Sequence, residues 1–460
     1  MTRADSIYQG VPTRAGSLAA RGGVSPASET LTLWAVFLTP FISLGLDLGV
    51  DVDPARLLVA LSVLALLLTP SARNRPHYSR CSILVGFCAY VCVLTIATSS
   101  SVPNPYNTND ELLRSSSTRW IAQLAMLSLN MGAFWISYRL GRSPGGPSRV
   151  MRVMVASSVT LCLLGMIQLA TFATGIASFG IGDLQHGFTR LAIIPAGGMN
   201  ILRMSALGGE PKHFAGSLLP VLAMLLAGLL TGSEAPASRK PLRYLVLVAV
   251  CFVLTFSTSS FYGFLVFVPL AFWALRRQLR ITFPRVVVLG LVLLFLFALH
   301  SLNPAVAGDV FETRVSGRVG EVDNPEAVAL AFLSDNPSYL VFGVGWGNIG
   351  FYGRPYLRST EAYLSRNVLP LSSFSLRILS ETGIVGLFLL MWFQVSVAAD
   401  GLREIRLCAD HKLKSTLIGL VTAAIAVVSL QPFNSSSFQW VIWGALCAAN
   451  ATAQLRRLGR

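Results

Sequence analysis

Charge is scarce in this sequence, because Asp, Glu, Lys and Arg together make up only 12% of its 460 residues, whereas hydrophobic residues make up 53%. Soluble globular domains carry about twice that share of charge, so an ordinary soluble protein is excluded. The 7 cysteines show no spacing typical of a metal site. Every cysteine lies in an apolar segment, at the end of one or in a short basic connection, so none is placed for an external disulfide. The composition predicts a polytopic membrane protein.

The apolar residues form about twelve segments long enough to cross a bilayer, since a helix that spans ~30 Å of hydrocarbon needs about 20 largely apolar residues. We therefore expect an all-α fold with residues 30–453 as a single transmembrane domain. Residues 1–29 are predicted to form a disordered cytoplasmic tail, and residues 454–460 a second cytoplasmic tail. The predicted spans lie near 30–49, 56–70, 82–99, 119–138, 151–173, 213–231, 241–257, 259–275, 284–301, 372–398, 414–431 and 435–453.

Lys and Arg gather at alternate connections between these spans, beginning with the N-terminus. By the positive-inside rule, both termini are expected in the cytoplasm. The net charge of +15 is then balanced by anionic lipid headgroups and does not indicate nucleic acid. Two long connections, about 174–211 and 302–371, are expected to face outward, and loops of that length are usually functional. In the second, residues 324–333 have the pattern of a short amphipathic helix lying along the membrane surface.

The stretch Glu210-Pro211-Lys212-His213 leads directly into the sixth predicted span. Pro211 suits the first position of a helix and Glu210 agrees with the helix dipole, so both have an ordinary capping explanation. Lys212 and His213 face a repulsive dipole there, which is tolerated when an anion binds or when water screens the charges. Both interpretations stay open. Arg203, in the first outer loop, is a further candidate for binding.

Two more pairs of charged residues follow. Arg314 and Arg318 are four positions apart, so on a helix their guanidinium groups could chelate a phosphate or pyrophosphate together, or they could contact lipid headgroups or nearby acids. Arg377 and Glu381 have the same spacing at the outer end of the tenth predicted span, where they could pair with each other. Because charge inside a helix of the membrane is costly, either this pair faces water, a partner or a substrate, or the true span starts near Gly383.

Between these pairs the sequence Gly343-Val344-Gly345-Trp346-Gly347-Asn348-Ile349-Gly350 contains a formal GxGxxG pattern. A dinucleotide fold would need a following helix, a second parallel strand and an acidic residue about 20 positions on, and this context is missing. We therefore expect the glycines to allow a tight approach of the backbone to a ligand or to a neighbouring helix.

The order of these features resembles the O-antigen polymerase/ligase family. An outer loop with arginines, an amphipathic helix, the Gly-Val-Gly-Trp-Gly-Asn run and a span beginning near Ser380-Glu381-Thr382-Gly383 carry the resemblance, which covers roughly residues 205–400. The segment Glu210-Pro211-Lys212-His213-Phe214-Ala215 is also similar to one in bacterial exopolysaccharide polymerases of that group.

The resemblance implies a glycosyltransferase of the bacterial inner membrane whose active site faces the periplasm and which needs no metal or other cofactor. Its substrates would be oligosaccharides on undecaprenyl pyrophosphate, with membrane lipids, a flippase and a chain-length regulator as further partners. Arginines of the outer loop are thought to bind the pyrophosphate, and Arg314 and Arg318 match by position. Arg203, Lys212 and Arg377 are further candidates for binding pyrophosphate or glycan, and the candidates for the base that takes the proton of the acceptor hydroxyl are Glu210, His213 and Glu381.

The ligase branch of the family commonly has a His-Asn pair before the equivalent of the tenth span, whereas this sequence has Val368-Leu369-Pro370-Leu371-Ser372 there. That difference favours a polymerase over a ligase, which stays an alternative. A secondary transporter is a third hypothesis, and it would require ionisable groups near the middle of the bilayer and broken helices there.

Overall fold

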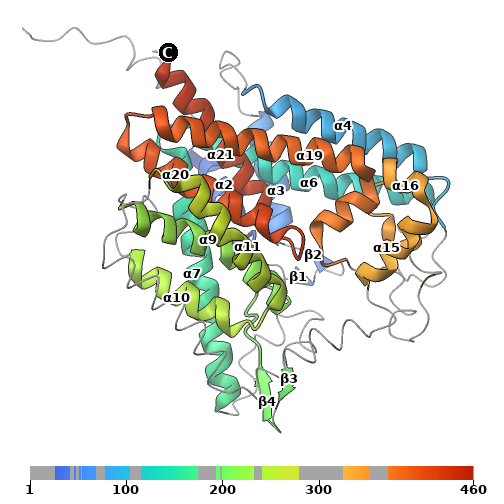
Figure 1. Ribbon diagram of the computed structural model, residues 1–460, viewed down its shortest axis with the longest axis horizontal. Coiled ribbons are helices and arrows are strands. Elements are labelled where there is room, and N and C mark those ends of the chain that lie inside the picture. The colour runs from blue at the N-terminus through green and yellow to red at the C-terminus, as the bar shows by residue number, and fades with distance from the viewer. Residues whose placement is uncertain are drawn as a thin grey trace, which may run out of the picture.

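The structure, a computed structural model, is a bundle of helices with two very short antiparallel hairpins (Figure 1). It describes residues 26–41, 46–47, 51–52, 54–68, 78–103, 116–174, 193–196, 199–232, 241–278, 325–352, 356 and 371–458. The helices are α2 (Pro26–Leu38), α3 (Pro54–Leu68), α4 (Cys81–Thr98), α6 (Ser116–Gly141), α7 (Gly146–Ala173), α9 (Pro211–Thr231), α10 (Pro241–Leu254), α11 (Thr258–Leu275), α15 (Pro325–Asp335), α16 (Pro337–Phe342), α17 (Ile349–Tyr352), α19 (Phe374–Leu407), α20 (His411–Leu430) and α21 (Gln439–Arg457). The hairpins pair β1 (Leu46–Asp47) with β2 (Asp51–Val52) and β3 (Ile193–Ala196) with β4 (Met199–Leu202).

Within the described residues, seven helices are long and apolar enough to cross a membrane: α4, α6 from Arg119, α7, α9, α11, α19 and α20. Helices α3 and α10 are apolar but shorter. The prediction of a helical protein that crosses a membrane several times is therefore confirmed. The seven helices do not by themselves establish the predicted number of about twelve spans.

Most helices lie where the apolar segments predict them, and the differences are at the ends. The predicted span 30–49 is wrong in its bounds, because α2 begins at Pro26, inside the predicted N-terminal tail, and ends at Leu38. Pro40 follows, which cannot continue the hydrogen bonding of a helix. At the other terminus α21 continues to Arg457, into the segment predicted as a tail. The predicted span 284–301 lies outside the described residues.

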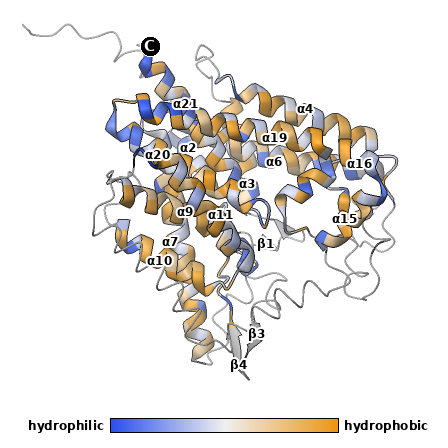
Figure 2. Ribbon diagram, in the orientation of Figure 1, coloured by the Kyte–Doolittle hydropathy of each residue, from blue (hydrophilic) through white to orange (hydrophobic). Residues whose placement is uncertain are grey.

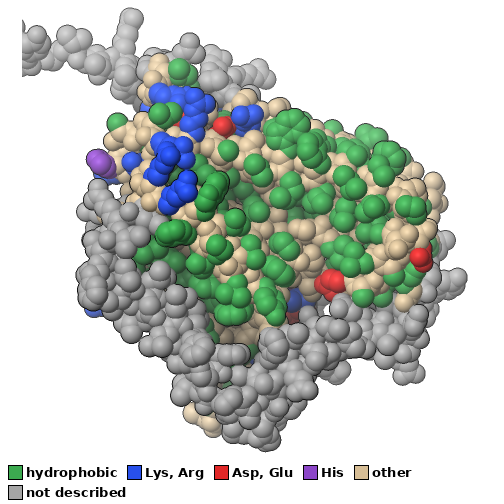
Figure 3. All heavy atoms as spheres, viewed as in Figure 1, with side chains coloured by type: hydrophobic (Ala, Val, Ile, Leu, Met, Phe, Trp, Pro, Cys, Tyr) green, Lys and Arg blue, Asp and Glu red, His purple; other side chains and the backbone are tan. Residues whose placement is uncertain are grey.

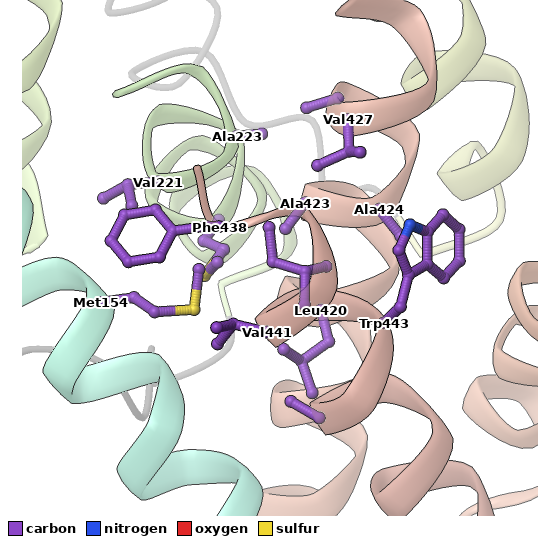
Figure 4. Close-up of a cluster of buried hydrophobic side chains, with 14 of the residues drawn as sticks. Met154, Val221, Ala223, Leu420, Ala423, Ala424, Val427, Phe438, Val441 and Trp443 are labelled. Carbon is purple, nitrogen blue, oxygen red and sulfur yellow. The ribbon is translucent and has the colours of Figure 1, made fainter. Parts of the chain in front are cut away.

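The core of the bundle is formed by α9 and α20. In the most apolar stretch of α9, 83% of the residues are buried, and in that of α20, 78% are. The same share is only 22% in α4 and 28% in α11. Side chains from α7, α9, α20 and α21 meet there, with alanines of α20 allowing close approach beside large residues such as Phe438 and Trp443 (Figure 4). The outer helices expose large apolar side chains, including Leu68, Val93 and Trp273. Such a continuous apolar surface is suited to lipid and not to water (Figures 2 and 3).

Lys and Arg side chains gather at the end of the bundle where α21 ends (Figure 3). Arg80 pairs there with Asp400 at 3.1 Å and Arg457 with Glu404 at 3.3 Å, and Arg456 pairs with Asp410. Arg149 of α7 pairs with Glu29 of α2. Helix α2 therefore begins at the same basic end at which α19 and α21 finish.

Candidate functional site

The candidate site lies at the N-terminal ends of α9 and α19. Its first component is a lysine with two polar partners. Glu210 precedes α9 in an extended conformation and Pro211 occupies its first turn, as predicted. The Lys212 ammonium lies 2.8 Å from the Glu210 carboxylate and donates a hydrogen bond of 3.1 Å to the Ser372 hydroxyl. Glu210 thus offsets the repulsion that Lys212 experiences from the helix dipole.

Ser372 connects this pair to two other elements. Its backbone N–H donates to the carboxylate of Glu326 in α15 at 2.9 Å. The next residue, Ser373, caps α19, because its hydroxyl accepts a hydrogen bond from the N–H of Leu376. The starts of α9, α15 and α19 are therefore joined through one serine.

Glu210 is surrounded by positive charge. Burial raises the pKa of Glu210, but the charge and hydrogen bond of Lys212, together with the charge of Arg203, lower it by more, so the pKa lies below its ordinary value. Glu210 is consequently ionised at neutral pH and is a weak proton acceptor. His213 is half-buried in the first turn of α9, where its carbonyl accepts a hydrogen bond from Ser217.

Arg203 lowers the pKa of Glu210 through its charge, and it also binds the end of another helix. Its guanidinium is buried and donates to the carbonyls of Thr255 at 3.1 Å and Phe256 at 3.2 Å, which follow the last turn of α10. Arg203 therefore caps the C-terminal end of α10, where a positive charge is favourable. Sequence reasoning missed this because the partners are far away in the chain.

Arg377 and Glu381 form the predicted ion pair, with 3.0 Å between Arg377 Nε and Glu381 Oε1. The guanidinium carbon also lies 5.6 Å from the centre of the Trp346 ring, within the range of a cation–π contact. The Glu381 side chain is 1% exposed, and its second oxygen, Oε2, has no hydrogen-bond partner among the described residues. Besides Arg377, the backbone N–H of Gly347, in the glycine-rich run, interacts with this carboxylate, so Glu381 is held from two elements.

The glycine-rich run approaches α19 at a break in that helix. Gly383 has a φ of 66° and a ψ of −174°, which no helical residue adopts. The N–H groups of Val344 and Gly345 donate to the carbonyls of Ser380 and Glu381 at 3.1 and 2.9 Å, so the loop satisfies acceptors that the break leaves open. A Cβ at Gly343 would lie 2.4 Å from the Glu381 carbonyl oxygen. The predicted tight approach of the backbone is confirmed, and what it approaches is a neighbouring helix.

Residues on the other side of this loop were missed by sequence reasoning. The N–H of Trp346 donates to Thr95 of α4 at 3.0 Å, and Gln123 of α6 donates to Asn348 at 2.6 Å. Arg119 of α6 is buried with its guanidinium 4.4 Å from the centre of the Phe351 ring. The signal in the sequence was the spacing of Arg119 and Gln123 on one face at the start of a predicted span. These contacts hold the loop, and with it Trp346, against α4 and α6.

The structure brings together Glu210 with Lys212 and Arg377 with Glu381, and it connects Lys212 to the start of α19 through Ser372. Arg314 and Arg318 lie outside the described residues, so their prediction is untested. In the part of the chain that is described, no group of three His, Cys, Asp or Glu side chains could hold a metal ion.

No known family model matches the chain, and no curated protein is similar enough to count as a relative.

Proposed function

We propose that this chain is a polysaccharide polymerase of the bacterial inner membrane. It transfers a growing glycan from undecaprenyl pyrophosphate onto a lipid-linked repeat unit at the outer leaflet. The observation that carries the proposal is the pair of cations, Lys212 and Arg377, each held by a carboxylate where α9 and α19 begin, with Lys212 also bonded to Ser372, just before α19. A diphosphate leaving group needs fixed positive charge at such a place.

The orientation in this proposal has both termini in the cytoplasm, about twelve spans and the two long loops outside. The gathering of Lys and Arg at the end of the bundle opposite the candidate site supports it. A periplasmic active site is then reached by lipid-linked substrates from the outer leaflet.

In the reaction the acceptor hydroxyl oxygen bonds to the anomeric carbon of the donor, while the bond from that carbon to the diphosphate oxygen breaks. The diphosphate leaves with the electron pair, and Lys212 and Arg377, together with Arg203, Arg314 and Arg318, stabilise its charge. The proton of the hydroxyl passes to a base. Glu381 suits this role better than Glu210, because the lowered pKa of Glu210 makes it a weaker base.

Transport is the alternative that one observation favours, since α19 is broken and many transporters bind ions at broken helices. Two facts count against it. The break at Gly383 lies near the start of the 34-residue helix and not at its middle. The carbonyls of Ser380 and Glu381 next to the break accept hydrogen bonds from Val344 and Gly345, so they are occupied by the protein itself.

The test is deletion of the gene followed by electrophoresis of the surface glycans, with complementation by wild type, Arg377→Ala or Arg403→Ala. Arg403 is an exposed arginine near the other end of the same helix and serves as the matched control. We expect the deletion and Arg377→Ala to leave single repeat units, and Arg403→Ala to restore the polymer. Full-length polymer that accumulates on its lipid carrier would indicate the ligase, and unchanged glycan in the deletion strain would refute both.

A further inference from the structure

The turn that joins α20 to α21 contains a group of buried polar atoms without partners. Gln431 is 2%, Asn434 0%, Ser436 6% and Gln439 2% exposed. Among the described residues no hydrogen-bond partner exists for Gln431 Nε2, Asn434 Oδ1, Ser436 Oγ, or for either amide atom of Gln439. We call these four residues the amide turn.

Such a concentration needs an explanation. Nearly all buried polar groups in native proteins are hydrogen-bonded, and leaving one without a partner destabilises the fold. A protein that only had to pack two helices together would be more stable with apolar side chains at these positions. The amide turn is therefore expected to bind something that supplies the missing donors and acceptors.

The amide turn lies against the two helices that carry the candidate charged groups. Asn434 donates its other amide group to the carbonyl of Lys212 at 2.6 Å, and the Ser217 and Ser437 hydroxyls are 3.0 Å apart. On the side of α19, the N–H of Ser375 donates to the Gln431 carbonyl at 3.0 Å. The turn is thus fixed between the start of α9 and the start of α19.

The chemistry of the group points to a neutral ligand. Amides and a hydroxyl offer both donors and acceptors and carry no charge, whereas an anion would require cations and a metal ion would require carboxylates or imidazoles. A sugar ring, with hydroxyl groups that donate and accept, matches this set. Between Gln431 and Asn434, Pro432 is exposed and Phe433 is half-buried, so the turn reaches the surface beside the buried groups.

We infer that the amide turn is a subsite that recognises the hydroxyl groups of a neutral sugar of the acceptor glycan, next to the charged groups that bind the diphosphate. This inference rests on the proposed function and deepens it, because it assigns sugar recognition and diphosphate recognition to different residues. The cationic groups would hold either substrate carrier, whereas the amide turn would distinguish one glycan from another.

The experiment compares Gln439→Leu and Ser436→Ala with the matched control Gln394→Leu. Gln394 is also fully buried with both amide atoms unpartnered, but it lies in α19 well beyond Glu381. Each purified full-length protein is titrated with neutral, water-soluble fragments of the host's own surface glycan, which carry no lipid or diphosphate. The thermal midpoint of each protein is measured in parallel.

We expect both glutamine variants to unfold at a higher temperature than wild type, because each removes unpartnered polar atoms. Gln439→Leu and Ser436→Ala should weaken fragment binding by about tenfold or more, and Gln394→Leu should leave it unchanged. Equal binding by all four proteins would overturn the inference and identify the amide turn as a site of structural water. Wild type that binds no fragment, although it polymerises lipid-linked repeats, would overturn the subsite and leave the proposed function standing. Fragment binding in a protein whose deletion leaves the surface glycan unchanged would support the subsite and reject the polymerase.

Discussion

Replacing Gly383 with alanine tests whether the break in α19 holds the site together. A Cβ at this position would lie 2.1 Å from the carbonyl oxygen of Val341, and the backbone occupies a region of φ and ψ that is essentially restricted to glycine. Holding another residue in such a conformation costs about 1–3 kcal/mol. The hydrogen bonds from Val344 and Gly345 to α19 would also be lost as the loop shifts, at about 1 kcal/mol each. We expect Gly383→Ala to lower the free energy of unfolding by about 3–5 kcal/mol, a large share of a typical stability.

The control for this variant is Gly86→Ala in α4. Apart from the backbone of α4 itself, no atom lies within 4 Å of a Cβ built there, and alanine in the interior of a helix is more stable than glycine by roughly 0.5–1 kcal/mol. In the assay, each detergent-solubilised protein is heated and then run on a size-exclusion column, and the fraction that still elutes as a monodisperse peak is measured. The thermal midpoint should fall in Gly383→Ala and stay equal or rise in Gly86→Ala. Equal midpoints in the two variants would show that the break at Gly383 does not hold the glycine-rich loop against α19.

Two other predictions concern carboxylates, Glu210 and Asp400, and the groups that they pair with. The lowered pKa of Glu210 means that its pair with Lys212 stabilises the fold above the ordinary carboxyl pKa of about 4.3 and that this contribution disappears as the pH falls through the lowered value in the folded state. Lys212→Met should therefore lose less of its thermal midpoint on acidification than wild type, and an identical pH dependence would contradict the assignment. At the basic end, Asp400 accepts hydrogen bonds from Tyr78 at 2.7 Å and Arg80 at 3.1 Å. Asp400→Ala leaves the buried Tyr78 hydroxyl without this acceptor and should lower the free energy of unfolding by about 1–3 kcal/mol, which a denaturation series on the solubilised protein measures.

The positions of the helices could be predicted from the sequence because the length of an apolar segment limits where a span can lie. The pairing of Arg377 with Glu381 could be predicted as well, since residues four apart on a helix are neighbours. The early end of α2 could have been found from Pro40.

The remaining features depend on contacts between distant parts of the chain. From the sequence, Gly383 could be the start of the span or a tolerated helical glycine, and a break inside one helix becomes evident only with the loop from Gly343 docked on it. Arg203 caps carbonyls that lie 52 and 53 residues away, which no local pattern reveals. Gln439 is likewise only 2% exposed although it is polar, and its neighbours in sequence do not reveal this burial.

In the proposed function, the charged groups where α9 and α19 begin drive transfer of glycan between lipid carriers. Its most direct test places purified protein in vesicles with lipid-linked repeat units extracted from the deletion strain and follows the products by electrophoresis. Wild type is predicted to convert the units into a ladder of longer glycans that remain on the lipid, and Arg377→Ala is predicted to leave them as single units. Repeat units that stay single with the wild-type protein would contradict the account.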